Sequence, residues 1–451
     1  MSAPRRVAVV GGGIAGLAAA RELAVGGAEV VVYEAADRLG GKIETSEVGG
    51  RPVDAGADAF PARVPHALEL CKSLGIEGEL VSPATGSASL WLAGRLRPLP
   101  GGLLLGVPAR LGPLAAAGIL SLAGLARAAV EPLLPGEPLQ GDEAVGTLIR
   151  RRFGPEVHER LVDPLLGGIN AGRTEELSVE VGAAQLAAVA RRSRSLLLGL
   201  RRAQRDAAGP AGPVFLAPRA GVGRLVGALA DDLSRRGVAL RPGSPVHRLD
   251  DLDADAMVVA TEAGPAGRLL AGRSPEAAGL IGGMAYASVV LTTLVYPAAA
   301  FAHPPVGSGF LVPRVEGRLL TAASFGSNKW PHWSAPGTVV VRASGGRFGD
   351  ERAMALPDDG LVAAVRDELG LMAGVGGEPV EARVTRWPAA FPQFAPGHLA
   401  RLARIEVALA RDAPAVAIAG AWTRGVGIPA CIASGQGAAR QVIAALAGAG
   451  R

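Results

Sequence analysis

Residues 7–34 decide the fold, and they read VAVVGGGIAGLAAARELAVGGAEVVVYE. An apolar run over residues 7–10 predicts a first strand, a helix is expected over about residues 14–24, and an apolar run over residues 30–33 predicts a second strand. Glu34 closes the second run, 23 residues after the first glycine of the loop. An acid there can accept hydrogen bonds from ribose hydroxyls, which disfavours NADP and predicts a dinucleotide-binding βαβ unit.

The loop before the helix carries Gly11, Gly13 and Gly16 in the spacing G-x-G-x-x-G. Gly11 lets the strand turn tightly, Gly13 lets the backbone approach a pyrophosphate, and Gly16 lets the helix pack closely on the sheet. The phosphates are expected on the unpaired N–H groups of the helix N-terminus, at Ile14 and Ala15. An ordinary glycine-rich turn is the alternative, but the flanking strands and the terminal acid favour the nucleotide site.

The nine residues after Glu34 read AADRLGGKI and distinguish FAD from NAD. They resemble an extension found in the amine oxidase and phytoene desaturase superfamily of flavoproteins, where a glycine pair and a basic residue pass the FAD pyrophosphate. Residues 53–58, VDAGAD, resemble that superfamily's next turn in contact with FAD. For Lys42 alone, a solvated surface lysine is the alternative. The resemblance assigns FAD contacts to Glu34, Ala35, Arg38, Gly41, Lys42, Gly56, Ala57, Asp58 and Ala59.

The chain has 451 residues and a net charge of +5, and its length suits two or three structural units. Because the sequence lacks an aromatic-rich basic module and a nucleic-acid motif, the positive charge does not predict a nucleic-acid partner. Cys71 and Cys431 form no metal or redox motif and favour a reducing cytoplasm. The uncharged run of residues 111–126 is too short to span a bilayer, but it leaves peripheral membrane contact open.

The pattern along the chain predicts a mixed α/β protein with a discontinuous Rossmann-like FAD-binding domain, formed by residues 1–85, 211–280 and 396–451. A helical domain that could contact a membrane is expected over residues 86–210, and strand-rich residues 281–395 predict a second sheet on the substrate side. Short apolar runs predict strands of the first domain over residues 238–240, 244–249, 256–261 and 416–420.

Four segments narrow the resemblance from superfamily to family. They are residues 163–172 (DPLLGGINAG), 324–332 (SFGSNKWPH), 386–398 (RWPAAFPQFAPGH) and 425–432 (GVGIPACI). In this combination, and over nearly its full length, the chain resembles the protoporphyrinogen oxidases and the coproporphyrinogen III oxidases of Gram-positive bacteria. Two departures are Ala430, where the family often has Asp, and Asn170, where Tyr is common.

This resemblance implies an FAD- and oxygen-dependent oxidase of haem biosynthesis, which removes six electrons from a porphyrinogen in three flavin cycles and releases H2O2. No catalytic side chain and no metal are expected, because the flavin carries the chemistry. For Trp387, packing in the core is an even alternative to a place near the flavin. The resemblance assigns further FAD contacts to Val246, Trp387, Gly420, Val426, Gly427 and Ile428.

The implied substrate is a large apolar disc with carboxylates on its rim, which needs an aliphatic pocket and basic anchors. A solvated surface position is the alternative for each anchor. The candidates for the pocket wall are helices within residues 103–134, residues 165–169 with Ile169, and residues 311–312. The candidate anchors are Arg63, Arg173 and Lys329.

The NKWPH and LLGGINAG segments favour coproporphyrinogen III as the substrate, with protoporphyrinogen IX as the alternative. An amine oxidase or a carotenoid desaturase is more remote, since a chain with three tyrosines is poorly supplied for an aromatic cage around an amine. A non-catalytic flavoprotein that acts as a scaffold in the haem pathway is a further alternative. Contact with a membrane or with other haem-pathway enzymes, and the oligomeric state, stay open.

Overall fold

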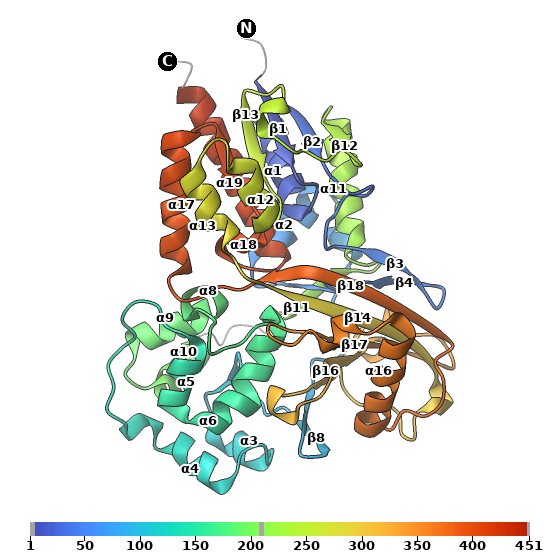
Figure 1. Cartoon of the computed structure of the whole chain (residues 1–451). Helices are drawn as coiled ribbons and strands as arrows, with labels where there is room; N and C mark the ends of the chain where they lie inside the picture. Colours follow the sequence, from blue (N-terminus) through green and yellow to red (C-terminus); the bar gives the residue numbers. More distant parts are fainter. Residues whose placement is uncertain (1–4, 207–211, 449–451) are drawn as a thin grey trace.

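The computed structural model describes residues 5–206 and 212–448 and divides into three parts (Figure 1). An α/β part with the N- and C-terminal segments lies at the top, a helical part at the lower left, and a part built on a mostly antiparallel sheet at the lower right. The expected mixed α/β class is confirmed. The expected domain boundary near residue 210 lies outside the described residues.

The α/β part contains a parallel sheet in the order β12-β2-β1-β13-β19. The strands β13 and β19 are neighbours although five strands of the second sheet, β14 to β18, lie between them in the sequence, so the nucleotide-binding fold is discontinuous, as expected. The strands are β1 (Arg6–Val10), β2 (Glu29–Tyr33), β12 (Ala239–Arg241), β13 (Ala256–Val259) and β19 (Val416–Ile418).

Helices cover both faces of this sheet, which explains why β13 is apolar at every position and β1 at every position after Arg6. Val7 and Val9 of β1 belong to one buried cluster, and Ala8 and Val10 belong to the cluster on the other face. The helices of the first cluster are α1 (Ile14–Val25), α2 (Pro65–Ser73), α11 (Gly223–Arg235) and α19 (Ile428–Gly448). Those of the second are α12 (Ala263–Leu270), α13 (Pro275–Gly282) and α17 (His398–Asp412).

The helix α1 lies unusually close to its neighbours on two sides. A Cβ atom at Gly16 would stand 1.9 Å from the carbonyl oxygen of Gly11, and a Cβ atom at Gly435 of α19 would stand 2.0 Å from the carbonyl oxygen of Ala15. Real Cβ atoms do not approach other atoms within 3.0 Å, so only glycine fits at either position. Gly16 therefore serves the close packing that the sequence predicts for it.

The second sheet has the order β18-β14-β17-β16-β15-β7-β8, and α16 (Asp358–Ala373) packs on it. The pairing of β7 with β15 brings residues 89–98 into this sheet, which moves the boundary expected at residue 86. The strands are β7 (Ser89–Leu92), β8 (Arg95–Pro98), β14 (Tyr286–Pro297), β15 (Gly309–Leu311), β16 (Leu320–Phe325), β17 (Thr338–Gly345) and β18 (Glu381–Pro392).

The helical part encloses a core of its own, in which Leu114, Ile119 and Ala128 are buried against α5 and α10. Most apolar side chains of residues 103–134 pack in or against this core, and none of these residues lines the cavity between the three parts, so the prediction that they form its wall is wrong. The helices are α3 (Leu111–Ala116), α4 (Leu122–Ala129), α5 (Val145–Phe153), α6 (Pro155–Val157), a π-helix (His158–Gly167), α7 (Gly168–Asn170), α8 (Val179–Gly182), α9 (Ala184–Arg192) and α10 (Leu196–Asp206).

Residues 244–249, expected as a strand, form an irregular segment with a bend at His247, after the turn at residues 242–243, and the start of a short 3-10 helix. The backbone N–H of Ser244 donates to the carbonyl of Glu34, and that of Gly243 donates to the carbonyl of Ala36. These bonds carry the chain across the end of β2 instead of alongside it. The remaining elements are the strands β3 (Thr45–Val48), β4 (Arg51–Asp54), β5 (Phe60–Pro61), β6 (Leu80–Val81), β9 (Leu103–Leu104), β10 (Val107–Pro108) and β11 (Phe215–Pro218), and the helices α14 (Gly326–Lys329), α15 (Arg352–Ala355) and α18 (Ala421–Arg424).

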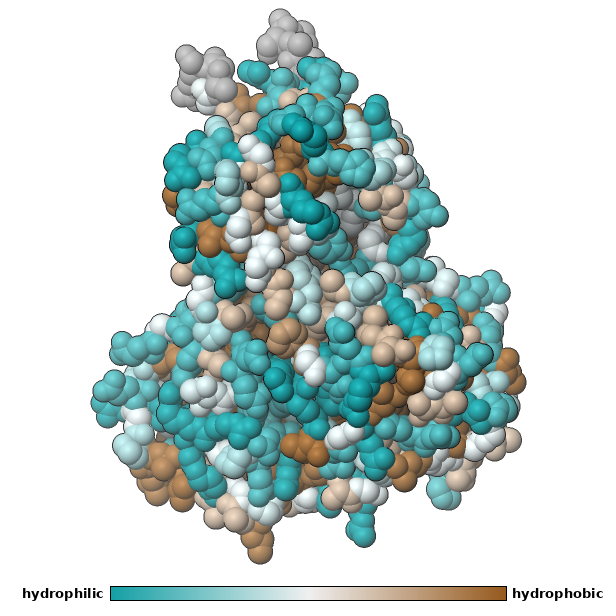
Figure 2. Space-filling view, viewed as in Figure 1, coloured by the Kyte–Doolittle hydropathy of each residue, from teal (hydrophilic) through white to brown (hydrophobic). Residues whose placement is uncertain are grey.

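Figure 2 shows a largely hydrophilic face, with hydrophobic residues gathered at the lower end of the helical part. Leu122 at the start of α4 and Leu133 beyond its end are 87% and 84% exposed. Within residues 5–206 and 212–448, no helix has both the length and the apolar character that a membrane crossing requires.

The contact between α1 and α19 gives a first test. Gly435→Ala forces the two backbones apart, so we expect the free energy of unfolding to fall by about 2 kcal/mol. Gly437→Ala, in the same helix, meets no atom within 4 Å and should be neutral or stabilising by up to about 1 kcal/mol. Denaturant unfolding of both variants and the wild type measures the difference, and equal midpoints for the two variants would contradict the packing argument.

Asp54 at the end of β4 gives a second test. Burial raises the pKa of this carboxyl to about 6, against the opposing effects of hydrogen bonds from Thr45 and from the backbone of Val222. A raised pKa in the folded state means that the stabilisation is complete below the unfolded pKa of 3.8 and is lost as the pH rises through about 6. The wild type should therefore lose about 2 kcal/mol more than Asp54→Asn between about pH 4 and about pH 8. Denaturant unfolding across this range measures the loss, and parallel pH profiles would refute it.

Candidate functional site

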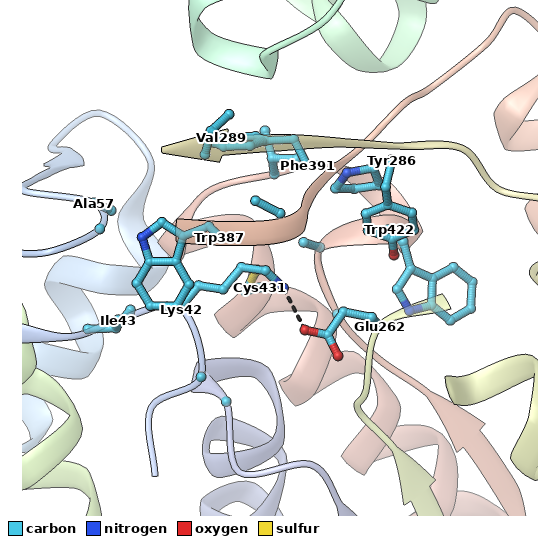
Figure 3. A pocket seen from close by; sticks show the side chains of 18 of the residues that line it. Lys42, Ile43, Ala57, Glu262, Tyr286, Val289, Trp387, Phe391, Trp422 and Cys431 are labelled. Carbon is cyan, nitrogen blue, oxygen red and sulfur yellow. Dashed lines mark hydrogen bonds and ion pairs between the residues drawn. The ribbon is translucent and has the colours of Figure 1, made fainter. Parts of the chain in front are cut away.

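A cavity of about 920 Å³ lies where the three parts of the molecule meet. Its walls come from the loop before α1, from the turn around residues 244–247, from the π-helix and from strands β14, β17 and β18. Figure 3 shows the section in which the α/β part faces the second sheet. The cavity is thus one continuous space with a nucleotide-fold end and an end between the sheet and the π-helix.

The glycine loop forms one end of this cavity. Gly11 has a φ of +113° and its N–H donates to the carbonyl of Tyr33 at 2.8 Å, which fixes the turn from β1. Gly13 is the N-cap of α1, has no side chain to cap the helix, and a Cβ atom built on it would meet no protein atom within 4 Å. The first N–H groups of α1 therefore face open space, and this arrangement fits a pyrophosphate.

Glu34 stands beside this loop at the end of β2. One carboxylate oxygen accepts a hydrogen bond from the N–H of Gly12 at 2.6 Å, and the other accepts from the N–H of Ala36 at 2.9 Å. Each oxygen can accept one more hydrogen bond, and Glu34 lines the cavity, so a ribose hydroxyl there can donate to it. Val246 lines the same region, within the turn that Ser244 anchors to Glu34.

The two basic residues after Glu34, Arg38 and Lys42, have different roles. The guanidinium of Arg38 donates to the carbonyls of Leu39, Gly41 and Ile43 and pairs with Glu44. Arg38 therefore holds the shape of the loop, and it is not among the residues that line the cavity.

Lys42, by contrast, lies in the cavity wall. Its Nζ is 2.6 Å from a carboxylate oxygen of Glu262, as Figure 3 shows. Burial raises the pKa of Glu262, but the attraction of Lys42 outweighs it and the net pKa is lowered. Lys42 is therefore a cation with a partner of its own within the wall.

The residues 56–59 form the next stretch of wall, and Asp58 is its charged centre. The carboxylate of Asp58 lies 2.7 Å from Lys329 Nζ and 3.2 Å from Arg342, and it accepts a hydrogen bond from Trp330 Nε1. Burial would raise the pKa of Asp58, but the two cations and the hydrogen bonds lower it to about 2. Lys329 thus forms an ion pair with Asp58 but is not itself among the residues that line the cavity.

Aromatic side chains line the cavity between its two ends. Trp387 of β18 lies beside Lys42 in Figure 3, and its Nε1 donates to the carbonyl of Ala55 at 2.9 Å. Tyr286 accepts a hydrogen bond from the N–H of Ala263, and burial raises its pKa to about 12. Cys431 lines the same section, and burial raises the pKa of its thiol to about 11.

The segment LLGGINAG forms the wall opposite the second sheet. It runs from the end of the π-helix into α7, and Ala171 then adopts a left-handed conformation with a φ of +46°. The carbonyl of Ala171 accepts from the N–H of Phe348, and Gln393 donates to the carbonyl of Asn170. Gly167, Gly168 and Gly172 leave the cavity open along this wall.

The structure places most of the predicted FAD contacts in one cavity. All of them line it except Gly16 and Arg38, which act in packing and in loop shape. The lining residues from that set are Gly11, Gly13, Ile14, Ala15, Glu34, Ala35, Gly41, Lys42, Gly56, Ala57, Asp58, Ala59, Val246, Trp387, Gly420, Val426, Gly427 and Ile428.

The predicted substrate contacts fare differently. Ile169 is 53% exposed, and neither it nor Arg63, Arg173 or Lys329 lines the cavity, whereas Val312 does. Sequence reasoning missed the charged residues at the far end of the cavity, and only Asp163 stood within a motif that pointed there. These residues are Asp163, Arg314 and Arg347. Arg342, which lines the cavity beside Asp58, was missed as well.

One group of side chains has the composition of a metal site. The ligand atoms of His158, Asp163 and Glu175 lie within 4.8 Å of one another. His158 Nε2 and Asp163 Oδ1, however, each share a 2.7 Å hydrogen bond with the Thr174 hydroxyl, and Glu175 pairs with Arg150. The group is therefore a hydrogen-bonded link between the π-helix and the chain that follows it.

The comparisons with known proteins agree with this geometry. Over residues 14–443 the chain matches the family described as flavin containing amine oxidoreductase, and it belongs to that family. Within it, the chain is 32% identical to a protein named coproporphyrinogen III oxidase from Bacillus subtilis, over 96% of this chain and 97% of that one. It is 35% identical to a protein of the same name from Mycobacterium bovis, over 98% of both chains.

A solved structure leads to the same group. The protein from Exiguobacterium sp. 255-15, provisionally titled a protoporphyrinogen oxidase, superposes with a TM-score of 0.87 and 28% identity, over 98% of this chain and 99% of that one. The resemblance carried by the four segments is confirmed. The protein is an FAD-dependent enzyme, and the glycine loop, Glu34 and the open helix N-terminus fit that cofactor.

The open space at Gly13 makes this assignment testable. The backbone at Gly13 has a φ of −70° and a ψ of 171°, which valine adopts freely, so Gly13→Val should fold normally. Its side chain would fill the place of the pyrophosphate, and we expect the purified variant to lose the visible flavin absorbance. Gly227→Val, on the exposed side of α11, is the matched control and should keep it. Normal FAD content in Gly13→Val would overturn the placement of the pyrophosphate.

Proposed function

We propose that this protein oxidises coproporphyrinogen III to coproporphyrin III in haem biosynthesis, with FAD as its cofactor. The name shared by the relatives from Bacillus subtilis and Mycobacterium bovis supports the reaction, since the similarity spans nearly the whole of each chain. The observation that carries the proposal is the single cavity that continues from the nucleotide fold into a space between the second sheet and the π-helix.

The walls of that far space suit a flat apolar macrocycle. Val289 and Leu291 of β14, Val312 and Phe391 line one side, and the backbone of Gly167 and Gly168 lines the other. Glycine at the second wall lets a ring system lie against backbone, and aliphatic side chains opposite it bury the apolar face. A substrate there would lie beside Trp387, which the hydrogen bond to Ala55 holds in place.

We assign the cofactor's parts to the lining residues by the chemistry of each. The N-terminus of α1 with Gly13 would hold the pyrophosphate, Glu34 the adenosine ribose, and Val246 the adenine. Bound FAD accepts two electrons per cycle and can pass them to O2, so removal of six electrons takes three cycles and yields three H2O2. Aromatisation of the macrocycle supplies the driving force for the reaction. The role of the protein is therefore to orient the substrate and to exclude water.

Protoporphyrinogen IX is the second candidate, and the name of the Exiguobacterium protein favours it. The two substrates differ on the rim, where coproporphyrinogen carries four carboxylates and protoporphyrinogen two. An amine oxidase, a carotenoid desaturase and a flavin-binding scaffold are the more remote candidates. Peroxide release that depends on an amine, bleaching of a polyene, or a flavin that no porphyrinogen reduces would identify them in turn.

We further infer that the protein works in the cytoplasm and that the lower end of its helical part touches a membrane or a partner. Cys71 and Cys431 are free thiols, which suits a reducing compartment. Leu122 and Leu133 of that part are exposed, and hydrophobic residues gather at its lower end in Figure 2.

Steady-state oxidation of both porphyrinogens under air, followed by porphyrin fluorescence, tests the proposed substrate. We expect kcat/KM for coproporphyrinogen III to exceed that for protoporphyrinogen IX by at least about tenfold, since the site then discriminates by rim contacts. Peroxide formed per porphyrin, measured in the same samples, checks oxygen as the acceptor. A ratio in favour of protoporphyrinogen would reverse the assignment, and oxidation of neither would end it.

A further inference from the structure

The far end of the cavity holds a cation whose guanidinium has no hydrogen bond within the described chain. Arg347 follows β17, is 8% exposed and lines the cavity. Its Nε is buried and has no partner, and the closest carboxylate is that of Asp350, at 3.8 Å. Both oxygens of Asp350 already accept shorter bonds from Arg352, at 2.9 and 2.8 Å.

A second cation lines the same space. Arg314 comes from the short 3-10 helix Arg314–Glu316, and its Nε is also buried without a hydrogen bond. One of its terminal nitrogens donates weakly to the carbonyl of Gly172, at 3.3 Å, and the nearest carboxylate, Asp163, is 3.9 Å away. Asp163 is itself engaged by Thr174. Burial, and then the positive charge of Arg314, lowers the pKa of Arg347, so the two cations lie close enough to repel each other.

Two other cations of this cavity wall, Lys42 and Arg342, differ in one respect, while Arg268, which also lines the cavity, is exposed to solvent. Lys42 has Glu262 at 2.6 Å, and Arg342 has Asp58 at 3.2 Å and the carbonyl of Gly56. Their charges are balanced inside the chain. Arg314 and Arg347 have only distant carboxylates that other groups already hold, and a buried charge in that state is costly to the fold. This loss of folding free energy is explained if an external anion binds between the two arginines and balances their charge.

We propose that Arg314 and Arg347 bind carboxylates on the rim of the substrate. The inference rests on the proposed function, since it is the porphyrinogen that brings carboxylates into this space. A guanidinium presents a planar pair of N–H donors that matches both oxygens of a carboxylate, and the bond is strong where water is excluded. The neighbouring side chains Val312 and Leu291 would contact the apolar ring while the two arginines fix its orientation.

The test replaces each arginine and measures binding and stability separately. Arg347→Met keeps the volume and removes the charge, Arg347→Lys keeps the charge without the fork, and Arg314→Gln tests the second cation. Arg404→Gln, a 65% exposed cation on α17, is the matched control. The dissociation constant of coproporphyrin III is read from the quenching of its fluorescence, KM and kcat from the oxidation, and the melting midpoint from the FAD-loaded protein without porphyrin.

We expect Arg347→Met and Arg314→Gln to raise the dissociation constant and KM by about tenfold to a hundredfold, while kcat changes little. Arg347→Lys should fall between Arg347→Met and the wild type, and Arg404→Gln should match the wild type. The melting midpoint of Arg347→Met should stay the same or rise, because the variant removes an unbalanced charge. A merely structural arginine predicts the reverse, a lower midpoint with unchanged binding, and that result would overturn the proposal.

The tetramethyl ester of coproporphyrin III, delivered in a mild detergent, separates recognition of carboxylates from contact with the ring. The wild type and Arg347→Met should bind the ester equally, since it has no carboxylate for the arginine to meet. A contrary result is that the wild type oxidises coproporphyrinogen while every variant binds coproporphyrin III as tightly as the wild type does. This result would refute the role of Arg314 and Arg347 as anchors and would leave the proposed function intact. A wild type that neither binds nor oxidises porphyrins would refute the proposed function and the anchors together.

Discussion

The separation between the backbone of α1 and those of its neighbours, set by Gly16 and Gly435, is the constraint on which the rest of the architecture depends. Because the helix is pressed against the sheet on one side and α19 on another, its first N–H groups stay fixed at the carboxyl ends of the strands. Open α/β sheets bind ligands at that edge. The insertions leave and rejoin the nucleotide fold nearby, so the second sheet and the π-helix become walls of a cavity that begins at the helix.

Charge along this cavity follows a simple division. Toward the nucleotide fold, Lys42 and Arg342 have carboxylates of the chain within 3.2 Å, so their charges are balanced without a ligand. At the far end, Arg347 has no comparable partner among the described residues, and Arg314 has only a weak bond to a carbonyl. The first arrangement supports a resident cofactor that stays in place, and the second suits a ligand that comes and goes. Affinity for a transient ligand is gained when binding relieves an existing electrostatic strain.

The parts that depend on local sequence were predictable. The glycine loop, α1 and Glu34 follow from spacing and hydrophobic pattern, and a resemblance in short motifs located Trp387 and residues 426–428 on the same cavity. Residues 244–249 were not, because an apolar run is equally compatible with a strand and with a turn held by long-range hydrogen bonds to Glu34 and Ala36. Arg347 and Arg314 belong to different loops with no motif around them, and only the pairing of β15, β16 and β17 brings those loops together.

The thiol of Cys431 shows what burial would do in an oxidase of the proposed kind, which releases peroxide. Peroxide attacks the thiolate form of cysteine and scarcely reacts with the protonated thiol. Cys431 lines the cavity beside Lys42, yet burial outweighs the attraction of that lysine and leaves its pKa near 11. At neutral pH the sulfur therefore stays protonated. In an oxidase of the proposed kind, the exclusion of water from the site therefore keeps the Cys431 thiol unreactive toward the peroxide that the enzyme releases.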